Sequence, residues 1–269
     1  MTDHLIETFK DGIATLTMNR PEARNALSGE MQSALSEALP RLAADRAVRV
    51  IVITGTGGAF CAGGDVKGFA ARNTAASEGG GRFDLEDRVH GLRAAMDVVR
   101  IVAEAPKPTL AVIPGAAAGA GLSLALACDI RVASKDAKLT TAFSKVGLAG
   151  DYGGSYFLTQ LVGTAKAREL YFTADVISGE EAARLGIVNE AVPSAEIEAA
   201  GERWAKRLAN LPTVAVGYMK RNLNAAAHST LGEVLDLEAM HMVRTFMTED
   251  HRSATAAFVE KRAPEFHGR

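Results

Sequence analysis

Two short apolar runs are each followed at once by a glycine-rich loop, and this pairing constrains the fold more than any other feature of the sequence. The first run, Val50–Ile53, leads into Gly55–Asp65 (GTGGAFCAGGD), and the second, Leu110–Ile113, leads into Gly115–Gly121 (GAAAGAG). Such β-branched runs are typical of strands that are buried on both faces of a parallel sheet. The sequence therefore predicts two strands whose exits are lined by bare backbone N–H groups.

The composition narrows the class of protein. The 269 residues are 48% hydrophobic and 23% charged, with a formal net charge of −2, which suits a soluble globular chain with one sizeable core. This balance argues against nucleic-acid and membrane partners, and no apolar run approaches the roughly 18 residues of a membrane span. No signal peptide is visible, and the chain has only two cysteines, Cys61 and Cys128. We therefore expect a cytoplasmic protein with no disulfide and no metal site.

Strand and helix signals alternate over the first part of the chain, and helical signals alone follow. Strands are expected at 13–18, 48–54, 109–113, 130–133, 139–142 and 186–192, and helices at 28–44, 85–104 and 121–128. Later helices are separated at Pro212, at 228–230 and at Thr248, and Met240, Met242 and Met247 are expected in a helix–helix core. The pattern predicts an α/β core over residues 1–195 and a helical C-terminal region over residues 196–269.

The glycine loops allow more than one interpretation. Tight turns alone would explain glycines at strand ends. A dinucleotide site is disfavoured because Phe60 stands where the third glycine of that fingerprint belongs, and neither loop has the Gly-Lys-Ser/Thr of a phosphate-binding loop. The remaining interpretation is an oxyanion site. In such a site two backbone N–H groups, one of them at a helix N-terminus, stabilise negative charge on a carbonyl oxygen.

Motifs along almost the whole chain resemble the crotonase superfamily, the enoyl-CoA hydratase/isomerase family. They are Asn19–Leu27 (NRPEARNAL), Ala59–Asp65, Pro114–Asp129, Gly147–Gly163, Ala182–Val188 and Phe258–Arg262. The resemblance implies an α/β fold, a spiral of β-β-α turns with a C-terminal helical trimerisation region, assembled as a trimer or hexamer. It also implies an acyl-CoA thioester as substrate. Coenzyme A is then part of the substrate, and no separate cofactor is expected.

The resemblance also assigns residues to the site. By position, the oxyanion amides are those of Gly64 and Ala120. The first motif and the first glycine loop line the coenzyme A groove in this family, and the C-terminal motif closes over it, from the same or a neighbouring subunit. The candidate coenzyme A contacts are Ala23, Arg24, Ala62, Asp65, Lys67, Phe258 and Lys261. The acyl pocket is expected between residues 69–92, which include a polar glycine-rich insert at 71–81, and the C-terminal helices.

The sequence departs from the family where hydratases carry two glutamates that activate water. Ser123 stands at the first of these positions and Phe143 at the second, and neither side chain can act as a general base near neutral pH. Both remain candidate substrate contacts, although the Ser123 hydroxyl could instead bond to its own helix backbone. The two-glutamate hydration mechanism is therefore not expected.

Asp151, in the segment GLAGDYGGS, is the carboxylate that remains. Its alternative role is an N-cap of the following helix. Family members with this segment resemble isomerases, and in family dehalogenases an aspartate at this place is a nucleophile. A carboxyl group facing an apolar pocket has a raised pKa, which suits proton transfer. We therefore expect Asp151 to move a proton along the acyl chain while the Gly64 and Ala120 amides hold the enolate.

An acyl-CoA isomerase is accordingly the expected function. The alternatives are a hydratase with a different mechanism, a hydrolase or dehalogenase with Asp151 as nucleophile, and a coenzyme A- or RNA-binding scaffold without chemistry. His90 is either a second acid–base group or a solvated residue on a helix face. Tyr152 either donates to Asp151 or packs the turn, and Cys61 is expected to be a small apolar spacer.

Overall fold

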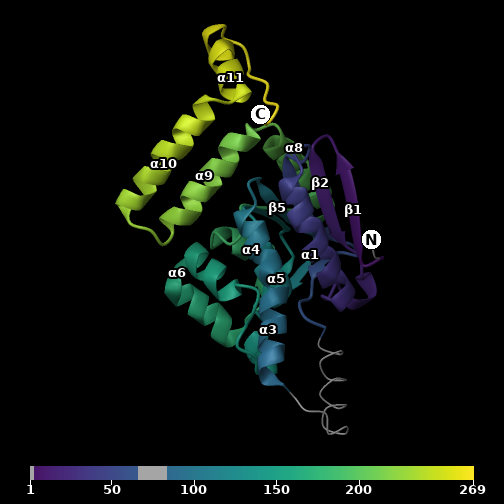
Figure 1. Ribbon diagram of the computed structural model, residues 1–269. Helices are drawn as coiled ribbons and strands as arrows, with labels where there is room; N and C mark the ends of the chain where they lie inside the picture. Colours follow the sequence, from purple (N-terminus) through teal and green to yellow (C-terminus); the bar gives the residue numbers. More distant parts are fainter. Residues whose placement is uncertain (1–2, 66–83) are drawn as a thin grey trace.

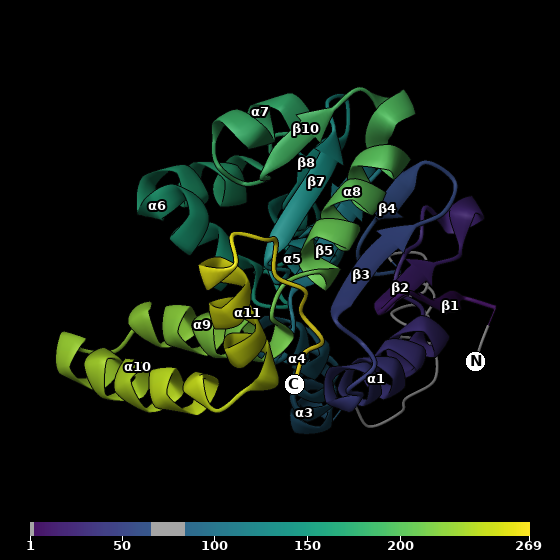
Figure 2. The same ribbon diagram turned by 90° about the horizontal axis from the view of Figure 1, so that it is seen from above.

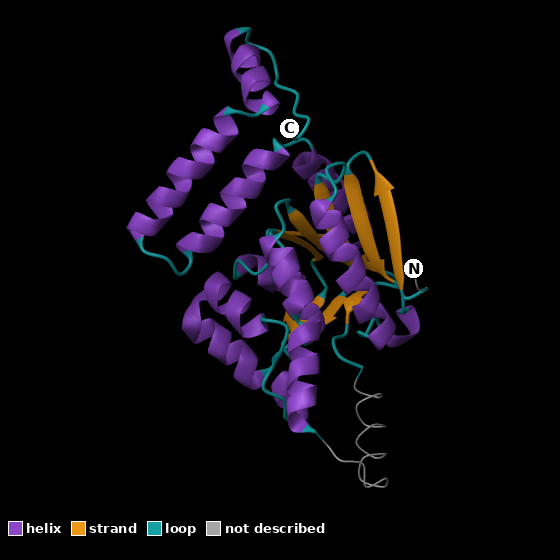
Figure 3. Ribbon diagram, in the orientation of Figure 1, coloured by secondary structure: helices purple, strands orange, loops and turns teal. Residues whose placement is uncertain are grey.

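The strands form two sheets in the computed structural model, which describes residues 3–65 and 84–269. They are β1 (Leu5–Lys10), β2 (Ile13–Met18), β3 (Val50–Gly55), β4 (Ala59–Cys61), β5 (Thr109–Ile113), β6 (Ala116–Ala118), β7 (Ile130–Ser134), β8 (Lys138–Thr140), β9 (Ile177–Ser178) and β10 (Glu190–Val192). The first sheet has the order β1-β2-β3-β5-β7-β10 and the second β4-β6-β8-β9, both mainly parallel. Figure 3 shows the strands in orange among the helices that cover them. The pairs β3–β4, β5–β6 and β7–β8 each give one strand to each sheet. This confirms the predicted spiral of β-β-α turns.

The helices surround these sheets and then form the C-terminal region (Figure 1). They are α1 (Gly29–Ala44), α3 (Leu85–Ala95), α4 (Asp97–Glu104), α5 (Ala120–Leu126), α6 (Gly154–Thr173), α7 (Gly179–Arg184), α8 (Ile197–Ala209), α9 (Thr213–Ala226), α10 (Leu231–Phe246) and α11 (Glu249–Val259). Short 3-10 turns lie at Pro21–Ala23, Phe143–Val146 and Ser194–Glu196. Among the described residues, no helix is both long and apolar enough to cross a membrane.

The two apolar runs are buried on both faces, as predicted. Alternate residues of a strand point to opposite faces, so Val50 and Val52 of β3 pack with α8. Ile51 and Ile53 point the other way, into the core that contains α1, α4 and α5. Figure 2 shows α8 lying over β3 and β5. Because both faces of the sheet are covered, these strands are apolar at successive positions. One of the covering helices is α8, which belongs to the predicted C-terminal region that begins at residue 196.

Two expectations about the helices are wrong. The predicted helix at 85–104 is divided at Met96 into α3 and α4, because α4 packs against α1 whereas α3 buries none of its residues. Met240, Met242 and Met247 are exposed within this chain rather than packed in a helix–helix core. The C-terminal helices α9 to α11 carry a broad exposed apolar surface that includes Met219, Leu223, Leu231, Leu235, Met242, Val243, Met247, Phe258 and Val259.

The helix α6 folds back on itself at Gly163, as Figure 1 shows. Gly163 has φ 73° and ψ 169°, a conformation that is essentially restricted to glycine. In a straight helix Gly154 and Tyr171 would lie about 25 Å apart at a rise of 1.5 Å per residue. The reversal instead returns Tyr171 to the beginning of α6, where a Cβ placed on Gly154 would lie 2.5 Å from the Tyr171 hydroxyl.

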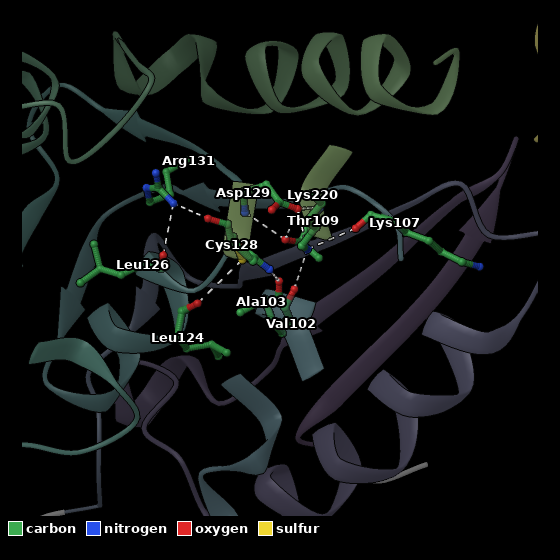
Figure 4. Close-up of polar contacts among 11 residues, drawn as sticks. Val102, Ala103, Lys107, Thr109, Leu124, Leu126, Cys128, Asp129, Arg131 and Lys220 are labelled. Carbon is green, nitrogen blue, oxygen red and sulfur yellow. Dashed lines mark hydrogen bonds and ion pairs between the residues drawn. The ribbon is translucent and has the colours of Figure 1, made fainter. Parts of the chain in front are cut away.

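A buried lysine ties α9 to the α/β core (Figure 4). The Lys220 ammonium donates to Asp129 Oδ2 at 2.8 Å, to the Val102 carbonyl at 2.8 Å and to the Lys107 carbonyl at 3.3 Å. Asp129 Oδ2 also accepts hydrogen bonds from the backbone N–H and the hydroxyl of Thr109, at 2.7 and 2.8 Å. The Lys220 side chain is only 6% exposed, so the core of the protein includes one charge from the C-terminal region.

Candidate active site

The first motif and the first glycine loop run side by side. The Ala62 N–H donates to the Arg24 carbonyl at 2.9 Å, and the Leu27 N–H donates to the Gly63 carbonyl at 2.8 Å. Ala23, Ala62 and Asp65 are partly exposed along this seam, and Arg24 is exposed. The structure therefore brings together four of the predicted coenzyme A contacts.

Asn25 holds this seam in place, a role that the sequence analysis missed. Its buried side chain donates to the carbonyls of Thr56 and Ala59, both at 2.9 Å, and accepts from the Arg20 N–H at 2.8 Å. Its φ of 58° lies in the left-handed region, which asparagine tolerates better than most residues. Asn25 stands between an arginine and two apolar residues, in a motif that pairs with a glycine loop. This polar residue in that position is the signal that could have identified its role.

The two glycine loops meet at Gly63 and Ala120. A Cβ on Gly63 would lie 2.7 Å from the Ala118 carbonyl oxygen and 3.4 Å from the Ala120 nitrogen. A Cβ on Gly121 would lie 2.3 Å from the Cys61 carbonyl oxygen. Glycine is therefore required where the backbones approach each other.

Gly64 and Ala120 have backbone amides with no acceptor among the residues that the structure describes. Ala120 is the first residue of α5, which is buried along its whole length. Its N-cap, Gly119, has φ 52° and ψ −127°, and no side chain caps this end. The first N–H groups of a helix lack internal partners and carry partial positive charge, so this buried end is suited to an oxygen that gains negative charge.

Asp151 lies in a turn in which several residues have positive φ, among them Gly150, Tyr152 and Gly153. Its Oδ1 atom is enclosed and has no hydrogen-bond partner among the described residues. Burial raises the pKa of this carboxyl group. The N-cap alternative is wrong, because α6 begins after Gly153 without any side-chain cap.

Ser123 and Phe143 lie next to the glycines that flank Asp151: a Cβ on Gly154 would be 2.3 Å from Ser123 Oγ, and a Cβ on Gly150 would be 3.5 Å from the Phe143 ring. The Ser123 hydroxyl donates to the Gly119 carbonyl at 3.1 Å, so the backbone-bonding alternative holds. Phe143 is buried, and its ring stacks on that of Tyr171 with centroids 6.1 Å apart and an interplanar angle of 18°. A Cβ on Gly119 would lie 3.6 Å from the Phe143 ring. Phe143 thus forms an apolar wall between α5 and the Asp151 turn.

Three other candidates are also placed by the structure. The Tyr152 hydroxyl is buried and, among the described residues, bonds to none, so the packing alternative holds and the residue does not donate to Asp151. Cys61 is fully buried, and burial raises the pKa of its thiol to about 12, as expected of an apolar spacer. His90 is exposed on α3, which agrees with a solvated residue on a helix face.

The remaining candidates lie away from the two loops. Phe258 is the penultimate residue of α11 and Lys261 follows the helix, and both are exposed. Figure 1 shows α11 at the opposite end of the molecule from α3. Lys67 and the insert at 71–81 lie outside the described residues. Leu85, Val89 and Leu92, in the described part of the expected acyl pocket, are exposed.

Comparison with known proteins agrees with this geometry. The pattern of the enoyl-CoA hydratase/isomerase family matches residues 8–269. A 1,2-epoxyphenylacetyl-CoA isomerase from Escherichia coli is 35% identical over 269 residues, which cover 100% of both chains. The mitochondrial enoyl-CoA hydratase domain-containing protein 2 of Bos taurus is 38% identical over 262 residues, which cover 96% of this chain and 85% of that protein.

The fold also matches that of a solved structure. The crystal structure of an enoyl-CoA hydratase from a Polaromonas species superposes with a TM-score of 0.89 and 34% identity, covering 97% of this chain and 99% of that chain. The fold and the sequence agree over nearly the full length. The chain therefore belongs to the enoyl-CoA hydratase/isomerase family of the crotonase superfamily, whose enzymes act on acyl-CoA thioesters.

Proposed function

We propose that this protein is an acyl-CoA isomerase in which Asp151 moves a proton between two carbons of the acyl group. The observation that carries the proposal is the enclosed Asp151 carboxyl oxygen, which has no partner among the described residues. Near neutral pH, serine and phenylalanine cannot serve as general bases at positions 123 and 143. Asp151 is therefore the group that takes the proton.

The turn that carries Asp151 packs against the oxyanion helix. A Cβ on Gly154, three residues after Asp151, would lie 2.3 Å from Ser123 Oγ, which in turn bonds to the Gly119 carbonyl at the start of α5. We propose that a thioester oxygen bound by the Ala120 amide has its neighbouring carbons on the side of α5 that faces this turn. This arrangement supports a carboxylate that acts next to the carbonyl.

In the proposed reaction, the amides of Gly64 and Ala120 donate to the thioester oxygen. Each such donor is typically worth about 3–4 kcal/mol of activation free energy. The Asp151 carboxylate accepts a proton from the carbon adjacent to the carbonyl, and the resulting enolate oxygen stays bound by the two amides. The carboxylic acid then returns the proton to a carbon further along the chain, so the double bond moves. Burial supports the first step, because a raised pKa makes the carboxylate a better base.

Coenzyme A binding and self-association complete the proposal. Ala23, Arg24, Ala62, Asp65 and Lys67 contact coenzyme A. Phe258 and Lys261 contact it from another copy of the chain, because within one copy α11 lies at the opposite end of the molecule from α3. The exposed apolar surface of α9 to α11 supports assembly as a trimer or hexamer. We place the protein in the cytoplasm, because both cysteines are buried and free.

Two thioesters separate isomerisation from hydration. With but-3-enoyl-CoA, an isomerase produces the conjugated thioester and its ultraviolet absorbance rises. With crotonyl-CoA, a hydratase consumes the conjugated thioester and the absorbance falls. We expect the rise with the first substrate and no rapid fall with the second.

The variant Asp151→Asn tests the role of the carboxylate. It should abolish the rise, whereas Asp175→Asn, which changes an exposed aspartate just after α6, should not. A fall with crotonyl-CoA would support hydration instead. A covalent acyl-enzyme detected by intact mass would make Asp151 a nucleophile, and isomerisation by Asp151→Asn at the unchanged rate would refute the proposal.

A further inference from the structure

Tyr171 lies against the turn that carries Asp151, although 19 residues separate the two in the sequence. A Cβ on Gly150 would lie 3.0 Å from Cε1 of the Tyr171 ring and 3.6 Å from its hydroxyl. A Cβ on Gly154 would lie 2.5 Å from the same hydroxyl. Glycines on both sides of Asp151 therefore leave the space that one phenol occupies.

The surroundings of the Tyr171 hydroxyl are polar on one side and apolar on the other. Phe143 stacks on the ring, and Ser123 Oγ lies near the same point of Gly154. The hydrogen of the Ser123 hydroxyl is already donated to the Gly119 carbonyl. The Tyr171 hydroxyl itself makes no hydrogen bond with a residue that the structure describes.

The position of this phenol favours its protonated form. Burial and, to a smaller extent, the charge of Asp151 raise the pKa of Tyr171 to about 12. The phenol is therefore protonated at neutral pH and can donate a hydrogen bond. The Oδ1 atom of Asp151, in the turn that Tyr171 contacts, is an enclosed acceptor without a partner among the described residues. Such an enclosed polar group costs free energy until a ligand supplies its partner.

We infer that Tyr171 is a specificity-determining residue whose hydroxyl donates a hydrogen bond to an oxygen atom on the α- or β-carbon of the acyl group. The inference rests on the proposed function, because it uses the place of Asp151 beside these carbons. A plain hydrocarbon chain leaves the phenol unpaired. A site that hydrogen-bonds a substrate oxygen discriminates strongly against the analogue that lacks it. The site therefore binds oxygen-bearing acyl thioesters more tightly than plain hydrocarbon ones, which it still accepts.

Calorimetric titration with three thioesters of equal chain length tests this selection without requiring turnover. They are butyryl-CoA, 2-hydroxybutyryl-CoA and 3-hydroxybutyryl-CoA. The wild-type protein should bind at least one hydroxylated thioester about 10-fold more tightly than butyryl-CoA, which corresponds to one well-placed hydrogen bond. Tyr171→Phe should bring the three affinities within about twofold of one another and leave that for butyryl-CoA unchanged.

A matched control is Tyr156→Phe. Tyr156 is on the same helix, is 50% exposed and lines a separate cavity of about 570 Å³ between α4, α6 and α9. This variant should keep the preference, and thermal unfolding of both variants checks that they fold. The preference of the wild-type protein is itself a test that needs no variant.

The possible failures are distinguishable. Equal binding of all three thioesters by the wild-type protein overturns the role of Tyr171 and leaves the Asp151 proposal standing. Equal weakening of all three by Tyr171→Phe also overturns it, because the hydroxyl would then act on the site as a whole. If no thioester binds, the proposed function fails, and this inference fails with it.

Discussion

The buried ion pair between Lys220 and Asp129 should make a large contribution to the free energy of unfolding. Replacing Lys220 by methionine keeps most of the side-chain volume but removes the ammonium group. Asp129 then loses its cation, and the carbonyls of Val102 and Lys107 lose a donor. The expected effect is destabilisation, because a buried charge is left without its partner.

Two features of the structure set the magnitude of this destabilisation. Breaking a buried ion pair from one side typically costs about 3–5 kcal/mol. Here the Asp129 side chain is 29% exposed and keeps both hydrogen bonds from Thr109, so water and these donors stabilise part of its charge. We therefore expect Lys220→Met to lower the free energy of unfolding by about 3 kcal/mol, the lower end of that range.

Urea-induced unfolding followed by circular dichroism measures this loss. It should be done at two protein concentrations, since self-association adds to apparent stability. Asp129→Asn should recover part of the loss when combined with Lys220→Met, because the amide is neutral and can still accept from Thr109. We expect a coupling free energy of at least about 1 kcal/mol. A loss below about 1 kcal/mol for Lys220→Met, or effects that simply add, would refute the reasoning.

Three further predictions concern single residues. Folding raises the pKa of Asp151, so the contribution of this group to stability is present below the ordinary carboxyl range and is lost as pH rises through the raised pKa. Asp151→Asn should therefore raise the melting temperature more at pH 8 than at pH 5. Equal increases at the two pH values would contradict this. Asn25→Ala removes three buried hydrogen bonds and should cost about 2–4 kcal/mol in urea unfolding, whereas a change below about 1 kcal/mol would argue against the seam. A Cβ on Gly163 would meet no other atom, but the φ of this residue is 73°. Gly163→Ala should therefore lower the free energy of unfolding by about 1–3 kcal/mol through backbone strain alone, measured by urea unfolding. An unchanged stability would show that the reversal tolerates a side chain.

Features that depend on local sequence were predictable. The strand at 109–113 and the helix that Ser28 caps follow from apolar periodicity and from a side chain that bonds to its own helix. The buried helix α5 follows from a run without polar residues other than one serine. The sheet of β4, β6, β8 and β9 was only partly predictable, because strands of two or three residues are too short to show a period.

Features that depend on distant contacts were not predictable. The division at Met96 reflects what α4 packs against, and the exposure of the C-terminal methionines reflects which surfaces one chain leaves uncovered. At the site, the approach of the two glycine loops could be expected, because only glycine permits it. The place of Tyr171 in the site could not be expected, since it depends on the reversal at Gly163, which the two non-helical dihedral angles of that one residue set.

The folded-back α6 has a consequence for how such enzymes diverge. Phe143, Asp151 and Tyr171 all belong to one continuous stretch of chain, whereas the amides of Gly64 and Ala120 come from two earlier loops. Under the proposed function, the stretch from 143 to 171 governs what happens to the acyl group, and the earlier loops govern how the thioester is held. Replacement of this one stretch, in evolution or by design, would then change the reaction while the two earlier loops continue to bind the thioester.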